Sequence, residues 1–484
     1  MKACMSARRR SPPRRLRPVV TLATALMATV PVAAALLWIT PAAAAEPDEP
    51  FPGRLPGDTG PVLCPAGGLD EASPLALAKA VDIALCNNAQ IRDAWIAIRI
   101  QTAALGQAKA AYWPTLSASV TELGDKTAYP GTEVPTTTRA EATIYGAFSW
   151  RLFDFGGRAA AKRAAESVLE AAVASRDATV EKILGTVIQT YFDAVTQRAV
   201  LDNQYDDEVL ARSTLDSARR KEARGGGAQS DTLQAATALS KVSLDKNRAM
   251  GEYEKSLAAL VYALGLPPGT PISLPQDVDL RTGVEEGDLR AWLKDAEQHH
   301  PAILAARAAV EAAHDEVIAA RSSGRPTVDL TADYYQNAYP GQGLTSTSTK
   351  VTTFGVSVTI PVFDGFLTHY KVQGAQETVK SKEAELQDTV QQTLMQVVQA
   401  YAGAQSSLRN LGVSEDLVNS AKAALESSQR RYDNGATDIL ELLTTQAALA
   451  NAKSERVRCL SEWRAARLTL LTSSGLLNRA SVGQ

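Results

Sequence analysis

The chain repeats itself, and this internal duplication constrains its fold more than any other feature. Residues of the first half recur about 210 positions later, and those nearer the start of each half recur at an offset of about 212. Each half reads as helix, strand, loop, strand and then very long helices. The matching pairs include Val187 and Val397, Tyr191 and Tyr401, Asp154 and Asp364, Gly265 and Gly475, and Ile91 and Ile303.

The helical regions are longer than ordinary globular helices. No proline occurs between Pro135 and Pro267, and residues 159–224 are rich in Ala, Glu, Arg, Leu and Gln, with Gly185 as the only glycine. At about 1.5 Å per residue, such a helix would reach on the order of 100 Å. A helix of that length needs partner helices along its whole course. Taken alone, the pattern would also suit a cytosolic coiled coil.

Four segments alternate between apolar and polar side chains over about ten residues, as strands with two different faces do. In a membrane the apolar faces would contact lipid and the polar faces would line a lumen. Without further context, the same alternation would suit a soluble sheet. The apolar faces include Phe148, Trp150, Val356 and Val358, and the polar faces include Ser149 and Ser357.

Residues 1–45 have the pattern of a secretory signal peptide. Arginine clusters within residues 8–17 precede a mostly apolar run, residues 19–39, and a small-residue cleavage site at residues 41–45. The apolar run is also long enough for an uncleaved membrane anchor, although Pro31 interrupts it. The predicted layout is a signal peptide (1–45), a Pro-rich periplasmic leader (46–73), a first repeat (74–266), a linker (267–291), a second repeat (292–477) and a C-terminal tail (478–484).

The charge balance argues against nucleic-acid binding. Seven of the 50 basic side chains lie in residues 1–45, which leaves 43 basic side chains against 53 acidic ones in the exported chain. After Glu46 no apolar stretch is long enough for a transmembrane helix. If the exported chain enters a membrane, it must therefore do so as a closed β-barrel.

Four strands are too few for such a barrel, because about eight is the smallest number that closes. Open sheet edges are not tolerated in lipid, so the strands of one chain must meet those of at least one more copy. The sequence therefore predicts an obligate oligomer if its strands lie in a membrane.

The order of elements, the duplicated halves and the segment 431–443 resemble the TolC family of outer-membrane efflux and secretion channels. The resemblance covers nearly all of residues 74–477 and includes the strand-to-helix junctions that follow Asp154 and Asp364. It implies a homotrimer of α+β membrane protein chains. In that trimer a 12-strand β-barrel in the outer membrane continues as a long α-helical barrel through the periplasm.

The same resemblance implies a passive conduit in a tripartite efflux pump or a type I secretion system, not an enzyme. The implied partners are outer-membrane lipid, a periplasmic membrane-fusion adaptor protein and an inner-membrane transporter of the RND or ABC type. A periplasmic coiled-coil adaptor or scaffold is the alternative function, since such a protein would also be exported and helical. A periplasmic hydrolase is disfavoured, because no catalytic motif is present.

Family members close their periplasmic end through contacts between helical hairpins and a ring of acidic residues. By position, Tyr432 matches the hairpin tyrosine of that latch, and Ser230 with Asp231 matches its partner pair. Glu441 matches the first acidic position of the pore constriction. Asp438 could supply a substitute carboxylate there. Asp438 also suits the start of a helix. Thr437 and Thr444 replace a latch arginine and a second acidic residue, so we do not expect a full copy of the latch.

The remaining motifs predict no catalytic residue, no cofactor and no metal site. Glu297, His299 and His300 cluster, but the two histidines face different ways on a helix, and a solvated helix end is the expected structure. In an oxidising compartment we expect a disulfide between Cys64 and Cys86. The alternative is two free thiols, one of them buried at Cys86.

Overall fold

A computed structural model describes residues 74–127, 130–131, 137–275, 288–337 and 349–477. The expected signal peptide, leader and C-terminal tail lie outside these residues, and so does Cys64. The helices are α1 (Leu77–Asn87), α2 (Ala89–Ala110), α3 (Gly157–Ala223), α4 (Gln229–Ala263), α5 (Leu289–His299), α6 (Pro301–Ser322), α7 (Leu367–Asp433) and α8 (Ile439–Ser473). The strands are β1 (Thr115–Thr127), β2 (Thr137–Phe153), β3 (Thr327–Asn337) and β4 (Thr349–Thr359). Within the described ranges, none of the helices combines the length and the apolar character that crossing a membrane requires.

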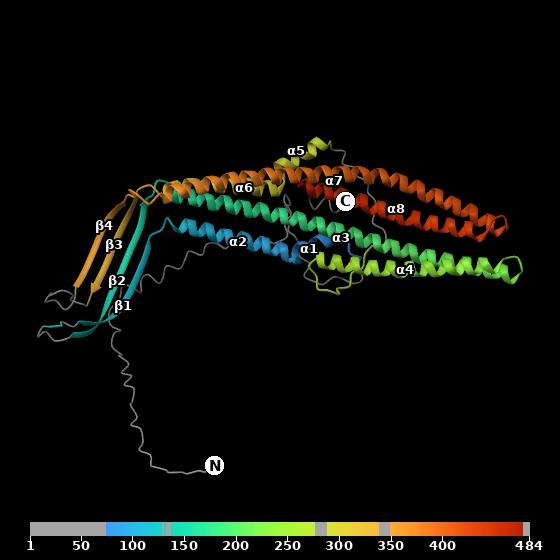
Figure 1. The fold of residues 1–484 in the computed structure, drawn as a ribbon, viewed down its shortest axis with the longest axis horizontal. Coiled ribbons are helices and arrows are strands. Elements are labelled where there is room, and N and C mark those ends of the chain that lie inside the picture. Colours follow the sequence, from blue (N-terminus) through green and yellow to red (C-terminus); the bar gives the residue numbers. More distant parts are fainter. Residues whose placement is uncertain (1–73, 128–129, 132–136, 276–287, 338–348, 478–484) are drawn as a thin grey trace, which may run out of the picture. The chain divides into compact units, whose positions relative to one another are not determined.

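The second half repeats the first in element order and helix length. α3 and α7 each contain 67 residues, α4 and α8 each contain 35, and α2 and α6 each contain 22. Figure 1 shows the two long hairpins, α3 with α4 and α7 with α8, beside each other. α3 also packs along α2, α6 and α8, so the long helix has neighbours over its course, as its length demands.

The four strands form one antiparallel sheet in the order β1-β2-β3-β4. Paired residues share a face, and one row of partners runs through Leu116, Phe148, Ala332 and Phe354. The opposite face carries polar contacts, including the Arg151 Nε bond to Asp329 Oδ1 at 2.9 Å. The predicted sheet with one apolar and one polar face is therefore confirmed.

The chain makes a tight turn where each half passes from sheet to long helix. Phe155 and Phe366 adopt left-handed backbone conformations, with φ of 52° and 66°, which are uncommon for residues other than glycine. Just before these helices, Asp154 Oδ2 accepts the Arg158 N–H at 2.8 Å and Asp364 Oδ2 accepts the Thr368 N–H at 2.9 Å. Equivalent aspartates thus satisfy free N–H groups at the starts of α3 and α7.

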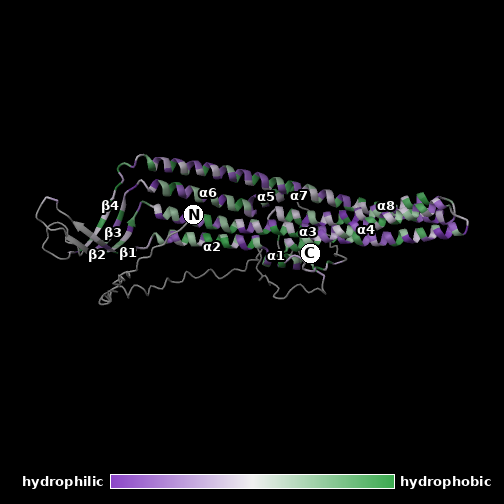
Figure 2. Ribbon diagram, turned by 60° about the horizontal axis from the view of Figure 1, so that its bottom comes forward, coloured by the Kyte–Doolittle hydropathy of each residue, from purple (hydrophilic) through white to green (hydrophobic). Residues whose placement is uncertain are grey.

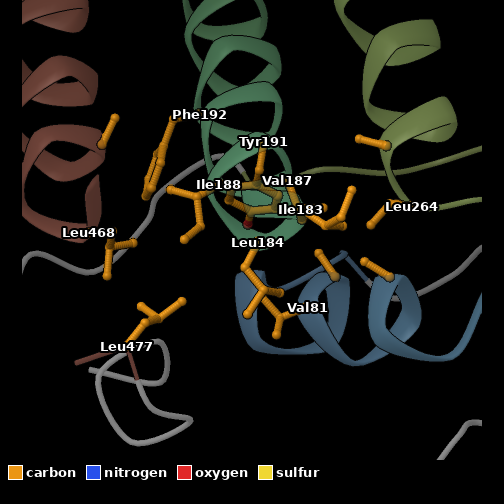
Figure 3. Packing of buried hydrophobic residues seen from close by; sticks show 14 of the residues in the cluster. Val81, Ile183, Leu184, Val187, Ile188, Tyr191, Phe192, Leu264, Leu468 and Leu477 are labelled. Carbon is orange, nitrogen blue, oxygen red and sulfur yellow. The ribbon is translucent and has the colours of Figure 1, made fainter. Parts of the chain in front are cut away.

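The main apolar core surrounds the middle of α3. Figure 3 shows Leu184, Val187 and Tyr191 of α3 near Val81 of α1, and all four are almost fully buried. The Tyr191 hydroxyl donates to the Leu75 carbonyl at 2.9 Å, so its polar end is satisfied inside the core. Away from this core, apolar and polar residues interleave along each long helix (Figure 2). Packing there depends on narrow stripes of contact between helices.

A glycine in the left-handed region ends α4 and another ends α8. Gly265 has φ of 71° and Gly475 has φ of 74°. The Leu266 N–H bonds the Val261 carbonyl at 3.1 Å, and the Leu476 N–H bonds the Leu471 carbonyl at 3.0 Å, as in a Schellman motif. Gly265 is also crowded, because a Cβ there would lie 2.7 Å from the Asn87 carbonyl oxygen.

We expect Gly265→Ala to destabilise the protein by about 1–3 kcal/mol, since it combines left-handed strain with a backbone clash. The measurement is the thermal unfolding midpoint followed by the helical circular dichroism signal. Gly251→Ala is the matched control, because Gly251 lies inside α4 with open space around its Cα. That change should be neutral or stabilising by up to about 1 kcal/mol. Equal midpoints for the two variants would contradict the assignment.

Candidate functional site

The candidate site is the pair of hairpin tips, where α3 turns into α4 and α7 turns into α8. Both turns use the same geometry. Gly225 and Gly435 have φ of 74° and 75°. The Gly226 N–H bonds the Lys221 carbonyl at 3.0 Å, and the Ala436 N–H bonds the Arg431 carbonyl at 2.8 Å. The backbone of the two tips is thus duplicated, and any difference between them comes from their side chains.

A small apolar cluster joins the two tips. Tyr432, in the last turn of α7, is 4% exposed and belongs to a cluster that draws residues from both hairpins. Further along, the Gln446 side-chain amide of α8 donates to the Thr214 hydroxyl of α3 at 2.8 Å. The buried members of the cluster are Leu215 and Ala218 of α3, Ala235 of α4, Tyr432 of α7, and Ile439 and Leu442 of α8.

The predicted latch residues lie at this junction but are not bonded to one another across it. The Ser230 hydroxyl donates to Asp231 Oδ1 at 3.3 Å, within α4. Burial raises the pKa of Tyr432, and the negative charges of Asp231 and Asp433 raise it further. Within the described residues, no hydrogen bond joins Tyr432 to Ser230 or Asp231. Instead, Lys221 Nζ lies 3.6 Å from the centre of the Tyr432 ring and donates to the Tyr432 carbonyl oxygen at 2.6 Å.

Glu441, the predicted acidic residue of the constriction, is paired within its own hairpin. Its Oε1 accepts from Arg431 Nη1 at 2.6 Å, and its Oε2 accepts from the Thr437 hydroxyl. Thr437 therefore orients this carboxylate where the family pattern has an arginine. The Thr444 hydroxyl bonds the Leu440 carbonyl of its own helix at 2.7 Å. The acidic charge at this tip is thus partly balanced by an adjacent guanidinium.

Asp438 is the N-cap of α8. Its backbone is extended, and its Oδ1 accepts the Glu441 N–H at 3.0 Å. This bond satisfies one of the N–H groups that a helix start leaves free. The capping role considered for Asp438 from the sequence is therefore present, and its carboxylate remains exposed beside that of Glu441.

We expect Asp438→Ala to destabilise the start of α8 by about 1 kcal/mol, because the cap is lost. Asp438→Asn should leave the cap intact, since asparagine caps about as well as aspartate, while removing the charge. Hydrogen exchange of the amides in the first turn of α8 is the measurement. Faster exchange in the alanine variant alone would separate capping from charge. Similarly fast exchange in both variants would show that the cap depends on the charge.

A second polar cluster, not expected from the sequence, lies in the middle of the helical region. Glu181 of α3 is 4% exposed, and its Oε2 lies 3.8 Å from His300 Nε2. His300 is the N-cap of α6, where its Nδ1 accepts the Ala302 N–H at 3.2 Å. The expectation of a solvated helix end is therefore wrong for His300, because its side chain is buried at the start of α6 and lies beside the buried Glu181 of α3. Only the equivalence of His300 with Asn88, the N-cap of α2, could have indicated this role.

Both members of this pair are neutral near pH 7. Burial, with the charge of Asp177 second, raises the pKa of Glu181 from 4.5 to about 8. Burial lowers the pKa of His300. Within the described residues, neither carboxyl oxygen of Glu181 has a hydrogen-bond partner, so no donor offsets the cost of ionising it.

This pair predicts a pH dependence of stability. The folded chain holds the Glu181 proton more tightly than the unfolded chain does. The resulting stabilisation is full below about pH 4.5 and is lost as the pH rises through about 8. Glu181→Gln should therefore reduce the fall in the unfolding midpoint between those two pH values. Glu166→Gln, which removes an exposed carboxylate from the same helix, is the control. An unchanged pH profile in Glu181→Gln would contradict the assignment.

The described cysteines differ in state. Cys86, the last residue but one of α1, is disulfide-bonded to a residue outside the described part of the chain. Cys459 in α8 is a free, buried thiol. The alternative of a free thiol at Cys86 is therefore wrong, whereas the pairing with Cys64 stays a prediction.

The chain is similar in sequence to known outer-membrane proteins. A family model described as outer membrane efflux protein matches residues 80–266 and 292–476. Protein CyaE of Bordetella pertussis is 33% identical over 88% of this chain and 89% of its own length. Outer membrane efflux protein BepC of Brucella suis is 24% identical over 88% of this chain and 90% of its own length.

Solved structures share the fold. The outer membrane protein VceC of Vibrio cholerae superposes with a TM-score of 0.71 and 20% identity. The match covers 82% of this chain and 96% of that one. At this identity the likeness shows the fold, a four-stranded sheet joined to long paired helices.

Proposed function

This chain belongs to the outer membrane efflux protein family, and we propose that three copies of it assemble into one continuous duct. The protein is an outer-membrane channel for efflux or type I secretion, with its helical region in the periplasm. It acts as a passive conduit from a periplasmic assembly to the exterior. Its helices α3 and α7, of 67 residues each, are long enough to extend on the order of 100 Å from the membrane.

The observation that carries the proposal is the unfinished sheet. β1 and β4 are its edges, and each has one side without a partner strand among the described residues. One face of the sheet is apolar, and exposed residues on it include Leu116, Phe354 and Val356. A sheet with open edges cannot lie in lipid, so β4 of one copy must pair with β1 of the next until the ring closes. Three copies supply the 12 strands that the family resemblance implies.

The helices support the same arrangement. α3 buries 18 of its 67 residues, whereas α7, its repeat of equal length, buries only six. Apolar residues are exposed along α7, and a second copy of the chain would cover this apolar surface. These exposed residues are Met395, Val398, Leu408, Val413 and Leu417.

Aromatic residues gather where the strands meet the helices, as expected at a membrane surface. Trp113, Phe363 and Tyr370 are 74%, 75% and 66% exposed, respectively. Phe155 and Phe366 accompany them in the strained turns. Aromatic girdles mark the interfaces of membrane barrels, so we place the periplasmic surface of the outer membrane at this junction.

The hairpin tips then form the periplasmic end of the duct. We place the carboxylates of Glu441 and Asp438 at its constriction and the side chains of Tyr432, Ser230 and Asp231 at the junction between its hairpins. A periplasmic membrane-fusion adaptor would meet the tips and connect them to an inner-membrane transporter of the RND or ABC type. We also propose that Cys64 is the disulfide partner of Cys86, which would tie the leader to α1.

Substitutions on the two faces of β4 test this proposal. Val356→Arg would place a charge in lipid and should impair assembly by about 2–4 kcal/mol near mid-bilayer. Ser357→Arg is the matched control. Ser357 is next to Val356 in β4, but its side chain lies on the polar face and would point into the lumen. The measurements are the yield of trimer in outer-membrane fractions and the conductance of purified protein in planar bilayers. Equal tolerance of both changes, or a wild-type protein that never conducts, would refute the channel.

A further inference from the structure

At the tip, one positively charged side chain of the first hairpin contacts the second hairpin. Lys221 lies in the last turn of α3, and its partner Tyr432 lies 211 residues away in the last turn of α7. The ammonium group donates to the Tyr432 carbonyl oxygen at 2.6 Å and lies 3.6 Å from the centre of the Tyr432 ring. A single side chain of the first hairpin thus holds both the backbone and the side chain of a residue in the second.

Three physical effects favour this position for a positive charge. The carbonyl oxygen belongs to the C-terminal turn of α7, where the helix dipole is negative and a cation is stabilised. The hydrogen bond is charge-assisted, and such bonds are about twice as strong as neutral ones. The ring face attracts the ammonium through its quadrupole, more strongly where water is partly excluded. The ring is buried and Lys221 itself is half-buried, so water competes weakly for the contact.

The equivalent residue of the second repeat makes no such contact with the other hairpin among the described residues. Arg431, which lies 210 positions after Lys221, bonds Glu441 inside its own hairpin. Thr437 also bonds Glu441 in that hairpin. At this tip, within the described residues, the only ion–ring or ion–carbonyl contact from one hairpin to the other is therefore that of Lys221. The apolar cluster around Tyr432 supplies the rest of the contact, but it has little directionality.

We propose that Lys221 is the positioning residue that ties the two hairpins together and holds the tip of the channel closed. The proposal rests on the proposed function, in which the tip is the periplasmic end of the duct. Moving α7 and α8 away from α3 and α4 breaks the bonds of Lys221 at once, because they are short and directional. The apolar cluster can slide before it separates. The contact of Lys221 with Tyr432 therefore determines how often the two hairpins separate spontaneously.

The test compares three variants of the full-length protein. Lys221→Met keeps a long side chain but removes the charge and the donor, and Lys221→Arg keeps both. Arg220→Met is the matched control. It removes the same charge one residue away, where the guanidinium donates a hydrogen bond to Ser217 of its own helix. Trimer yield and the helical circular dichroism signal establish that each variant folds.

Two measurements follow on each variant. The first is hydrogen exchange of the amides in residues 429–436, the last turn of α7 and its cap. The second is the unit conductance and open probability in planar bilayers. Loss of one charge-assisted hydrogen bond shifts an equilibrium by about tenfold, so exchange and open probability should each rise by about that factor in Lys221→Met. Lys221→Arg should remain near the wild type, and Arg220→Met should match it.

The outcomes separate this inference from the proposed function. If the amides of residues 429–436 exchange no faster in Lys221→Met than in Arg220→Met, then Lys221 does not tie the two hairpins together. If exchange rises in a conducting protein while conductance and open probability stay unchanged, the tie does not control opening, and the proposal is again overturned. If the wild type does not conduct at all, the channel function fails, while the exchange data still decide whether Lys221 joins the hairpins.

Discussion

Helix length is the constraint on which the rest of this structure depends. A helix of 67 residues gains most of its stability from tertiary packing, so it needs neighbouring helices along its course. α3 finds neighbours in α2, α4, α6 and α8 of its own chain. α7, which is equally long, packs on α5, α6 and α8 and remains exposed over much of its surface. The chain does not cover both long helices by itself, which is why the proposed association would complete the packing of α7. The unpaired edges of β1 and β4 impose the same requirement on the sheet.

Duplication gives the chain two equivalent backbones and lets their side chains diverge. Asn88 and His300 cap equivalent helices, but only His300 lies beside a buried carboxyl, that of Glu181. At the tips, the φ angles of the equivalent glycines, Gly225 and Gly435, differ by only one degree. The side chains around them make different bonds, one across the hairpins and one within a hairpin. A duplicated scaffold therefore carries two tips whose polar contacts differ.

Much of this architecture could be predicted from the sequence, because it follows from periodicity. The absence of proline between Pro135 and Pro267 predicted α3, the duplication predicted α7, and alternation predicted the two faces of the sheet. Partner choice among polar groups could not be predicted in the same way. Whether Lys221 meets Tyr432, which lies 211 positions further along the chain, depends on the rotation of one hairpin against the other. Likewise, the pairing of Glu441 with Arg431 depends on rotamers at a turn, which composition and spacing do not determine.

The polar contacts at the tip give a largely apolar junction a defined geometry. An interface of Leu215, Ile439 and Leu442 alone would gain free energy in proportion to the area it buries and would favour no particular geometry. Bonds from Lys221 to one carbonyl and one ring select a single arrangement, and they are lost over a small displacement. In the tie that we propose, the apolar contacts resist separation, while the cation defines the position of one hairpin against the other. Under this proposal, the tip would hold one closed geometry and would still separate once the bonds of Lys221 are broken.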